Sequence, residues 1–124
     1  MFKWFIVIGS IGAALSVALG AFGAHGLEGR LAERMMKNFQ TGVQYQMYHS
    51  LGLVLVGLIA WKLQDSSLIN AAGWGLLIGI ILFSGSLYVL SLTGITKLGM
   101  ITPFGGVAFI VGWILLVVAV MRAG

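Results

Sequence analysis

Four long apolar stretches alternate with short polar connections along the chain. They span about residues 2–24, 43–61, 68–92 and 103–121, and the last three contain no Asp, Glu, Lys or Arg. The first carries only Lys3, close to its start. A helix of about 20 apolar residues, rising about 1.5 Å per residue, crosses the hydrocarbon core of a bilayer. The pattern therefore predicts an all-α membrane protein, a bundle of four transmembrane helices in one domain over residues 1–124.

The first stretch also has features of a secretory signal peptide, because Lys3 precedes it and small residues lie around positions 21–24. Its apolar run is longer than the roughly 7–15 residues of a signal-peptide core. We therefore expect a retained helix.

The connection between the first two stretches has a helical pattern of its own, over about residues 28–40. Its apolar residues recur every four positions, at Leu27, Leu31, Met35 and Phe39. Its charged residues share the other side, at Arg30, Glu33, Arg34 and Lys37. We expect an interfacial amphipathic helix that lies in the headgroup plane until the chain turns into the bilayer at Gly42. The alternative is a helical connection packed on the end of the bundle.

Two of the helix starts carry capping signals. Asp65, Ser66 or Ser67 can cap the third helix, since each offers a side-chain oxygen to the first free backbone N–H groups. Thr102 is the expected N-cap of the fourth helix, with Pro103 at its first position.

The composition makes lipid the expected surroundings of this chain. It is 60% hydrophobic and 8% charged, whereas a soluble domain has about 25% charged residues. The net charge of +4 comes from scattered residues at segment ends, which favours a role in membrane orientation over nucleic-acid binding. The absence of Cys excludes disulfides and thiolate sites. We expect a multi-pass protein of a cell membrane, such as a bacterial plasma or inner membrane.

Small residues inside the stretches predict close helix packing. Membrane helices are held together by close packing and interhelical hydrogen bonds, because lipid provides little hydrophobic drive between them. The expected packing positions are Gly12, Ser16, Gly20, Gly75, Gly79, Gly105 and Gly112.

Polar side chains gather where the first stretch ends, the second begins and the third ends, all at one membrane face. This candidate polar cluster consists of His25, Tyr45, Gln46, His49, Ser50 and Tyr88. Two interpretations stay open: structural hydrogen bonds, worth roughly 0.6 kcal/mol each, or a site for a ligand or ion. We expect His25 and His49 in the same half of the membrane, within reach directly or through one intervening group.

Several kinds of site are disfavoured. Haem ligation by both histidines fits poorly, because His25 is expected to be shallower than His49 by roughly a turn and a half. A copper or zinc site would lack a carboxylate or thiolate ligand. Proton-coupled export usually uses an acid inside the membrane, and the four stretches contain none. The sequence shows no phosphate loop, nucleophile elbow or paired carboxylates, so we expect neither a metal, nor a cofactor, nor enzymatic activity.

Three motifs resemble a known family. They are "GAFGAHGL" at the end of the first stretch, "YQMYHSLGLVL" in the second and "TPFGG" at the start of the fourth. In this order they resemble the family called domain of unknown function 423, which is similar to transmembrane protein 256 of animals. The resemblance implies a four-helix integral membrane protein and no particular activity. It places the family's motif at Gly23, Ala24, His25, Gly26, His49, Ser50, Pro103, Gly105 and Gly106.

Two functions remain as hypotheses. The first is a non-enzymatic interaction protein, acting as an accessory or assembly partner of a larger membrane complex or as a homo-oligomer. The second is a transporter or channel for a small molecule or ion that uses the candidate polar cluster. A polar cavity that reaches the middle of the membrane would favour the second.

Overall fold

The computed structural model describes residues 2–64 and 66–123. Its α-helices are α1 (Phe2–Phe22), α2 (Glu33–Leu63), α3 (Ser67–Gly79), α4 (Gly85–Thr93) and α5 (Thr102–Arg122). Two π-helical turns, η1 (Gly23–Leu27) and η2 (Ile80–Ser84), and a 3-10 turn, η3 (Thr96–Met100), complete the described elements. Because the π turns extend their neighbours, the elements form four rods, each long and apolar enough to cross a membrane. This confirms the predicted fold class of an all-helical protein with four spans.

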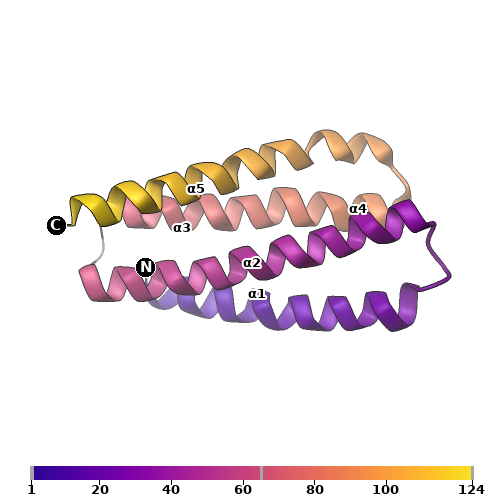
Figure 1. The fold of residues 1–124 in the computed structure, drawn as a ribbon, viewed down its shortest axis with the longest axis horizontal. Helices are drawn as coiled ribbons and strands as arrows, with labels where there is room; N and C mark the ends of the chain where they lie inside the picture. Colours follow the sequence, from indigo (N-terminus) through magenta and orange to yellow (C-terminus); the bar gives the residue numbers. More distant parts are fainter. Residues whose placement is uncertain (1, 65, 124) are drawn as a thin grey trace.

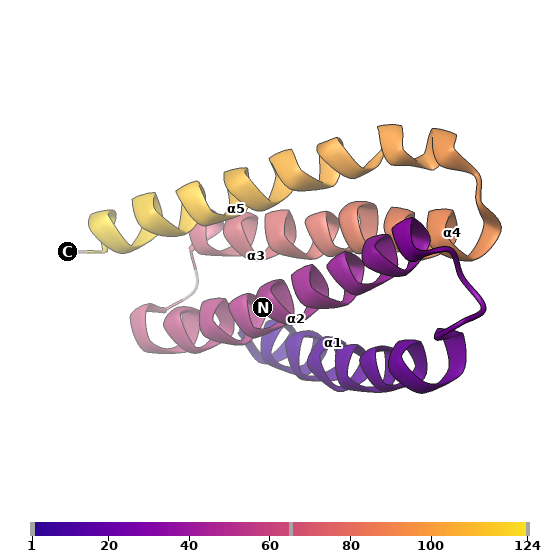
Figure 2. The same ribbon diagram turned by 45° about the vertical axis from the view of Figure 1, so that its right-hand side comes forward.

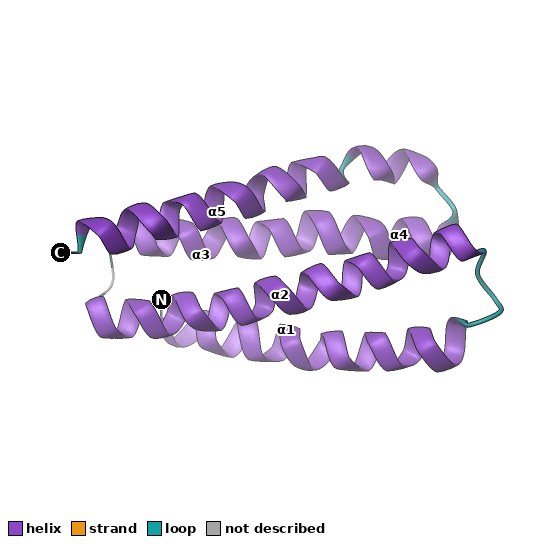
Figure 3. Ribbon diagram, viewed as in Figure 1, coloured by secondary structure: helices purple, strands orange, loops and turns teal. Residues whose placement is uncertain are grey.

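The four rods run antiparallel as two hairpins lying side by side (Figure 1). Helices α1 and α2 form one hairpin, and the α3–η2–α4 rod forms the other with α5. Helix α2 packs against the α3–η2–α4 rod, so these two are the central rods, and α1 and α5 flank them. Figure 2 shows the same order from another side, and Figure 3 shows how short the connections are.

Apolar and polar contacts occupy different halves of the interior. The main core cluster gathers toward the end that holds the N-terminus and the α2–α3 connection. Its buried members are Phe5, Leu53, Val56, Ala60, Ile69, Leu76, Phe109 and Ala119. Most of the buried polar side chains lie toward the other end, where α1 joins α2.

Glycines allow the helix backbones to approach one another. A Cβ atom on Gly75 of α3 would lie 2.9 Å from Cα of Gly112 of α5, so the two backbones are in direct contact. Gly105 faces the backbone of Phe83 in η2. Gly79 lies under the Phe109 ring. Close approach of this kind is how membrane helices gain packing energy without a hydrophobic drive.

The predicted interfacial helix over residues 28–40 is wrong. Helix α2 begins at Glu33 and continues without a break through Gly42 to Leu63. Gly42 is buried, and a Cβ atom there would lie 2.8 Å from Cε1 of Tyr88. This glycine therefore admits a neighbouring ring and does not end a helix. The apolar stripe of the segment faces the bundle, with Leu27 and Phe39 buried, so the packed alternative describes it better.

The two capping predictions have different outcomes. Ser66 caps α3, since its Oγ accepts a hydrogen bond from the N–H of Ile69 at 3.2 Å. Asp65 lies outside the described residues. Thr102 does not cap α5, because its hydroxyl pairs with Ser86 Oγ of α4 at 2.6 Å. Pro103 does lie in the first turn of α5.

Candidate functional site

Gln46 is the centre of a polar network that joins three helices. Its Nε2 donates to the carbonyl oxygen of Gly12 in α1 at 2.8 Å. Its Oε1 accepts from the hydroxyl of Tyr88 in α4 at 2.5 Å. The Gly12 carbonyl also accepts from Ser16 Oγ at 2.9 Å. With only 6% of Gln46 exposed, both ends of its amide are used inside the bundle.

Two serines make further bonds between helices. Ser84 Oγ in η2 donates to the carbonyl oxygen of Gly42 in α2 at 2.7 Å. The Ser86–Thr102 pair joins α4 to α5. Bonds of this kind, worth roughly 0.6 kcal/mol each on average, are a common means of holding membrane helices together. The network therefore has a structural role.

Ser50 is fully buried beside α1. Its Oγ has no hydrogen-bond partner among the described residues. A Cβ atom on Gly12 would collide with it. Ser50 thus marks the tightest part of the α1–α2 contact, and its hydroxyl faces another backbone with no room for a ligand between them.

His49 belongs to a different environment from Gln46, although both lie in α2. Its Nδ1 is 2.8 Å from the carbonyl oxygen of Tyr45, one turn earlier. Since a carbonyl can only accept, Nδ1 carries the proton and Nε2 of the neutral ring is an acceptor. The imidazole stacks on Phe109 of α5, with ring centroids 3.5 Å apart and planes inclined by 10°. It is 6% exposed.

His49 is part of an aromatic cluster formed by Tyr45, His49, Phe83, Phe109 and Trp113. Phe83 lies in the π-helical turn η2 and stacks on Tyr45 at 4.5 Å between centroids. Trp113 lies 5.8 Å from His49 and completes the cluster on α5. Phe83, Phe109 and Trp113 could not be predicted as neighbours of His49 from the sequence, because no spacing along the chain links residues on three separate rods. π-helical turns often accompany functional sites, so this cluster is of interest.

The predicted proximity of His25 and His49 is wrong. Gly12 faces Ser50 and Gly23 faces Phe39 across the α1–α2 contact, which places His25 level with the turn around Lys37. The two histidines are therefore about 18 Å apart along the bundle axis, at about 1.5 Å per residue. His25 is also exposed, whereas His49 is buried. The difference arises because the second helix was predicted to start at about Val43, whereas α2 begins at Glu33.

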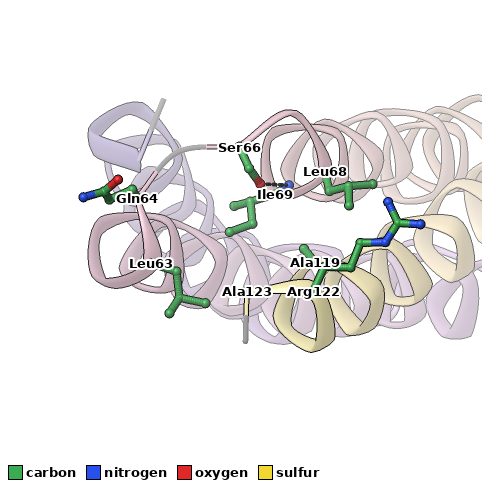
Figure 4. A pocket seen from close by; sticks show the side chains of 8 residues that line it. All are labelled: Leu63, Gln64, Ser66, Leu68, Ile69, Ala119, Arg122 and Ala123. Carbon is green, nitrogen blue, oxygen red and sulfur yellow. Dashed lines mark hydrogen bonds between the residues drawn. The ribbon is translucent and has the colours of Figure 1, made fainter.

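Two cavities lie at opposite ends of the bundle. The first, of about 240 Å³, lies between the end of α2, the start of α3 and the end of α5 (Figure 4). Its lining residues are Leu63, Gln64, Ser66, Leu68, Ile69, Ala119, Arg122 and Ala123. The second, of about 180 Å³, is an outward-facing groove between α1 and α2. It is lined by Gly20, Gly23, Phe39, Gln40, Val43 and Gln44, which we call the α1–α2 groove.

Neither cavity is lined by a member of the candidate polar cluster. Among the described residues, no group of three or more His, Cys, Asp or Glu side chains could hold a metal ion. The structure thus brings Gln46 and Tyr88 together through a hydrogen bond, stacks Tyr45 with His49, and leaves His25 apart.

Comparison with known proteins gives a consistent picture. The family model described as "Protein of unknown function (DUF423)" matches residues 19–106. UPF0382 membrane protein YwdK of Bacillus subtilis is 55% identical over 120 residues, which cover 97% of this chain and 98% of that protein. A UPF0382 membrane protein of Staphylococcus epidermidis is 50% identical over 120 residues, covering 97% of each chain. No solved structure matches this chain.

Proposed function

This chain belongs to the DUF423 family of membrane proteins, and we propose that it is a non-enzymatic interaction protein of the bacterial cell membrane. In this role it binds another membrane-spanning chain as an accessory or assembly partner. The observation that carries the proposal is the contrast between the glutamines of α2. Gln46 is buried and bonded within the bundle, whereas Gln40 and Gln44 are exposed on the outside.

The depth of the outer glutamines decides what can surround them. The 21 residues of α1 measure about 31 Å, which matches the hydrocarbon thickness of a bilayer. Gly20 faces Val43 across the α1–α2 contact, so Gln44 is level with Leu19 and Gln40 with Gly23. Gln44 therefore lies within the thickness that α1 crosses, and Gln40 lies at its edge.

An amide that faces hydrocarbon without a hydrogen-bond partner carries a desolvation penalty. In membrane proteins such side chains bond across helices. The described chain uses Gln46 in this way, and Gln40 and Gln44 present the same chemistry to a neighbour outside it. This supports an interaction role more than a role for the interior cluster.

The experiment is to determine the size of the protein in native membranes. A tagged chain, expressed at its natural level and extracted in a mild detergent, should migrate in a complex larger than one chain. Gln44→Leu should shift it toward the monomer, because the amide that faces the partner is lost. Gln64→Leu is the matched control, since Gln64 is exposed at the other end of α2. A monomer under all these conditions, with no partner captured by cross-linking in the membrane, would refute the proposal.

A transporter that uses the aromatic cluster is the second candidate. It is supported by His49, an ionisable side chain level with Ala13 near the middle of α1, and by the π-helical turn beside it. This candidate predicts that purified protein in liposomes conducts protons and that His49→Phe abolishes the flux. The interaction role predicts no flux from either protein.

A further inference from the structure

We propose that the cavity between the ends of α2, α3 and α5 binds the headgroup region of one anionic phospholipid, with Arg122 contacting the phosphate. This cavity, which we call the α2–α3–α5 cavity, has a volume of about 240 Å³. It lies at the opposite end of the bundle from the α1–α2 groove. The inference therefore goes beyond the proposed interaction function and does not depend on the outer glutamines.

The α2–α3–α5 cavity lies at the depth of lipid headgroups. It is formed where α2 ends at Leu63, α3 begins at Ser67 and α5 ends at Arg122. The 21 residues of α5 measure about 31 Å, which matches the hydrocarbon thickness of a bilayer, so Arg122 lies at one edge of that thickness. Trp4 and Trp61 are 58% and 65% exposed at the same end of the bundle. Exposed Trp side chains are enriched at this level of a membrane.

The lining of the cavity has an apolar part and a polar part. Ile69 and Ala119 are 1% and 4% exposed and belong to the main core cluster. Gln64, Ser66 and Arg122 are exposed. The lining thus changes from buried apolar side chains to exposed polar ones. A phospholipid changes in the same way, from its acyl chains to its phosphate.

The charge of this end of the bundle is complementary to an anionic lipid. Arg122 is the one charged side chain among the described residues that line the cavity, and Figure 4 shows it extending from α5 toward Leu68 of α3. A guanidinium group can donate two parallel hydrogen bonds to a phosphate, and basic pockets between transmembrane helices bind lipid headgroups. Lys3 and Lys62 are exposed at the same end. Against these three cations the sequence of the α2–α3 connection supplies one acid, Asp65.

The volume of the cavity favours a headgroup over a larger ligand. Pockets for drug-sized ligands measure about 300–1,000 Å³, and this cavity is smaller. It is several times the volume of a water molecule, about 30 Å³, which leaves room for a phosphate group and the glycerol carbons beside it. A soluble phosphate would share the contact with Arg122. The apolar floor of Ile69 and Ala119 favours the lipid, because only the lipid continues into acyl chains.

Lipid binding to the purified full chain tests the proposal. The protein is stripped of lipid in detergent and titrated with phosphatidylglycerol, which is anionic, or phosphatidylcholine, which is zwitterionic. Native mass spectrometry counts the bound molecules. We expect one tightly bound phosphatidylglycerol, with an affinity at least about tenfold higher than that of phosphatidylcholine, because three cations surround the site.

Four variants separate the site from the general charge of the protein. Arg122→Gln should lower the affinity for phosphatidylglycerol at least about tenfold, because a charge-assisted hydrogen bond is lost. Arg34→Gln is the matched control, since it removes the same charge from an exposed position at the other end of the bundle, and it should change nothing. Ala123→Phe keeps every charge but fills the cavity, so it should also weaken binding. Asp65→Asn removes the acid of the connection and should leave the affinity equal or higher.

Arg122 and Ala123 are exposed, so helicity and thermal stability without lipid should stay unchanged in their variants. This separates lost binding from lost folding. A loss of binding in Arg122→Gln and Ala123→Phe, with none in Arg34→Gln, is the result that supports the site.

Several results would overturn the inference. Equal losses for Arg122→Gln and Arg34→Gln would mean that binding follows net charge and needs no cavity. Equal affinities for the two lipids would refute the choice of an anionic lipid, and binding by Asp65→Asn alone would refute it for the natural chain. If inorganic phosphate bound as tightly as phosphatidylglycerol, the site would be one for a soluble anion. None of these results depends on a protein partner, so the proposed function stands or fails separately.

Discussion

The clearest consequence of the interior network concerns Gln46. Replacing it with Leu keeps a side chain of similar size but removes the bonds to the Gly12 carbonyl and the Tyr88 hydroxyl. Two interhelical bonds at roughly 0.6 kcal/mol each account for about 1.2 kcal/mol. The Gly12 carbonyl keeps its bond from Ser16, whereas the half-buried Tyr88 hydroxyl loses its acceptor, which adds about 1 kcal/mol or more. The free energy of unfolding should therefore fall by about 2 kcal/mol.

A double-mutant cycle with Tyr88→Phe tests the reasoning. In that background the Tyr88 hydroxyl is already absent. Gln46→Leu should then remove only the hydrogen bond to the Gly12 carbonyl and lower the free energy of unfolding by roughly 0.6 kcal/mol. The coupling energy between the two positions should therefore be about 1–2 kcal/mol. The assay is reversible unfolding in mixed micelles, followed by circular dichroism, at a dilution that keeps the protein monomeric.

Gln44→Leu is the matched control, because it makes the same chemical change two residues away on the exposed face of α2. It should leave the unfolding free energy of the monomer within about 0.5 kcal/mol. The hydrogen-bond network would be contradicted if Gln44→Leu and Gln46→Leu lowered the free energy of unfolding equally. A coupling energy near zero between Gln46 and Tyr88 would contradict it as well.

Three further predictions address the packing, the continuity of α2 and the aromatic cluster. Gly75→Ala should destabilise the bundle, because its new Cβ meets the α5 backbone, while Gly106→Ala, with no atom within 4 Å, should be neutral or stabilising in thermal unfolding. Spin labels at Glu33 and Lys62 should lie about 43 Å apart along a continuous α2 at 1.5 Å per residue, and a value near 33 Å would instead indicate a bend at the membrane surface. His49→Phe should change the unfolding free energy by less than about 1 kcal/mol, since the stack on α5 remains and the lost hydrogen bond lies within α2.

The four spans could be predicted from the sequence because their signal is local. A run of about 20 apolar residues has few alternatives to a membrane helix, and Pro103 marks the first turn of α5 because its ring fits there. The π-helical turns could not be predicted, since one additional residue in a turn leaves no mark in a uniformly apolar segment. Gly42 misled the prediction, because glycine can either end a helix or let another side chain come close.

For single residues of the candidate site, too, some contacts could be predicted from the sequence and others could not. Tyr88 and Gln46 were grouped because their helices meet at one end of the bundle, and the structure joins them by a hydrogen bond. The predicted depth of His49 assumed a second helix from residue 43, whereas α2 begins ten residues earlier at Glu33, which places His49 away from His25. A role of the candidate polar cluster in binding stays a prediction. Its buried members Gln46 and His49 are hydrogen-bonded to their neighbours, whereas the Ser50 hydroxyl is packed against Gly12 with no room for a ligand.

The two glutamines Gln44 and Gln46 show why function is better sought on the outside of this bundle. Two residues along a helix correspond to a rotation of about 200°, so these amides point in nearly opposite directions from α2. The inward amide is saturated by Gly12 and Tyr88, and substituting it would mainly test stability. The outward amide is exposed and level with Leu19 in α1, and facing hydrocarbon it would be costly unless another chain bonds to it. The proposed interaction role therefore rests on Gln44, whose exposed amide points away from the interior network.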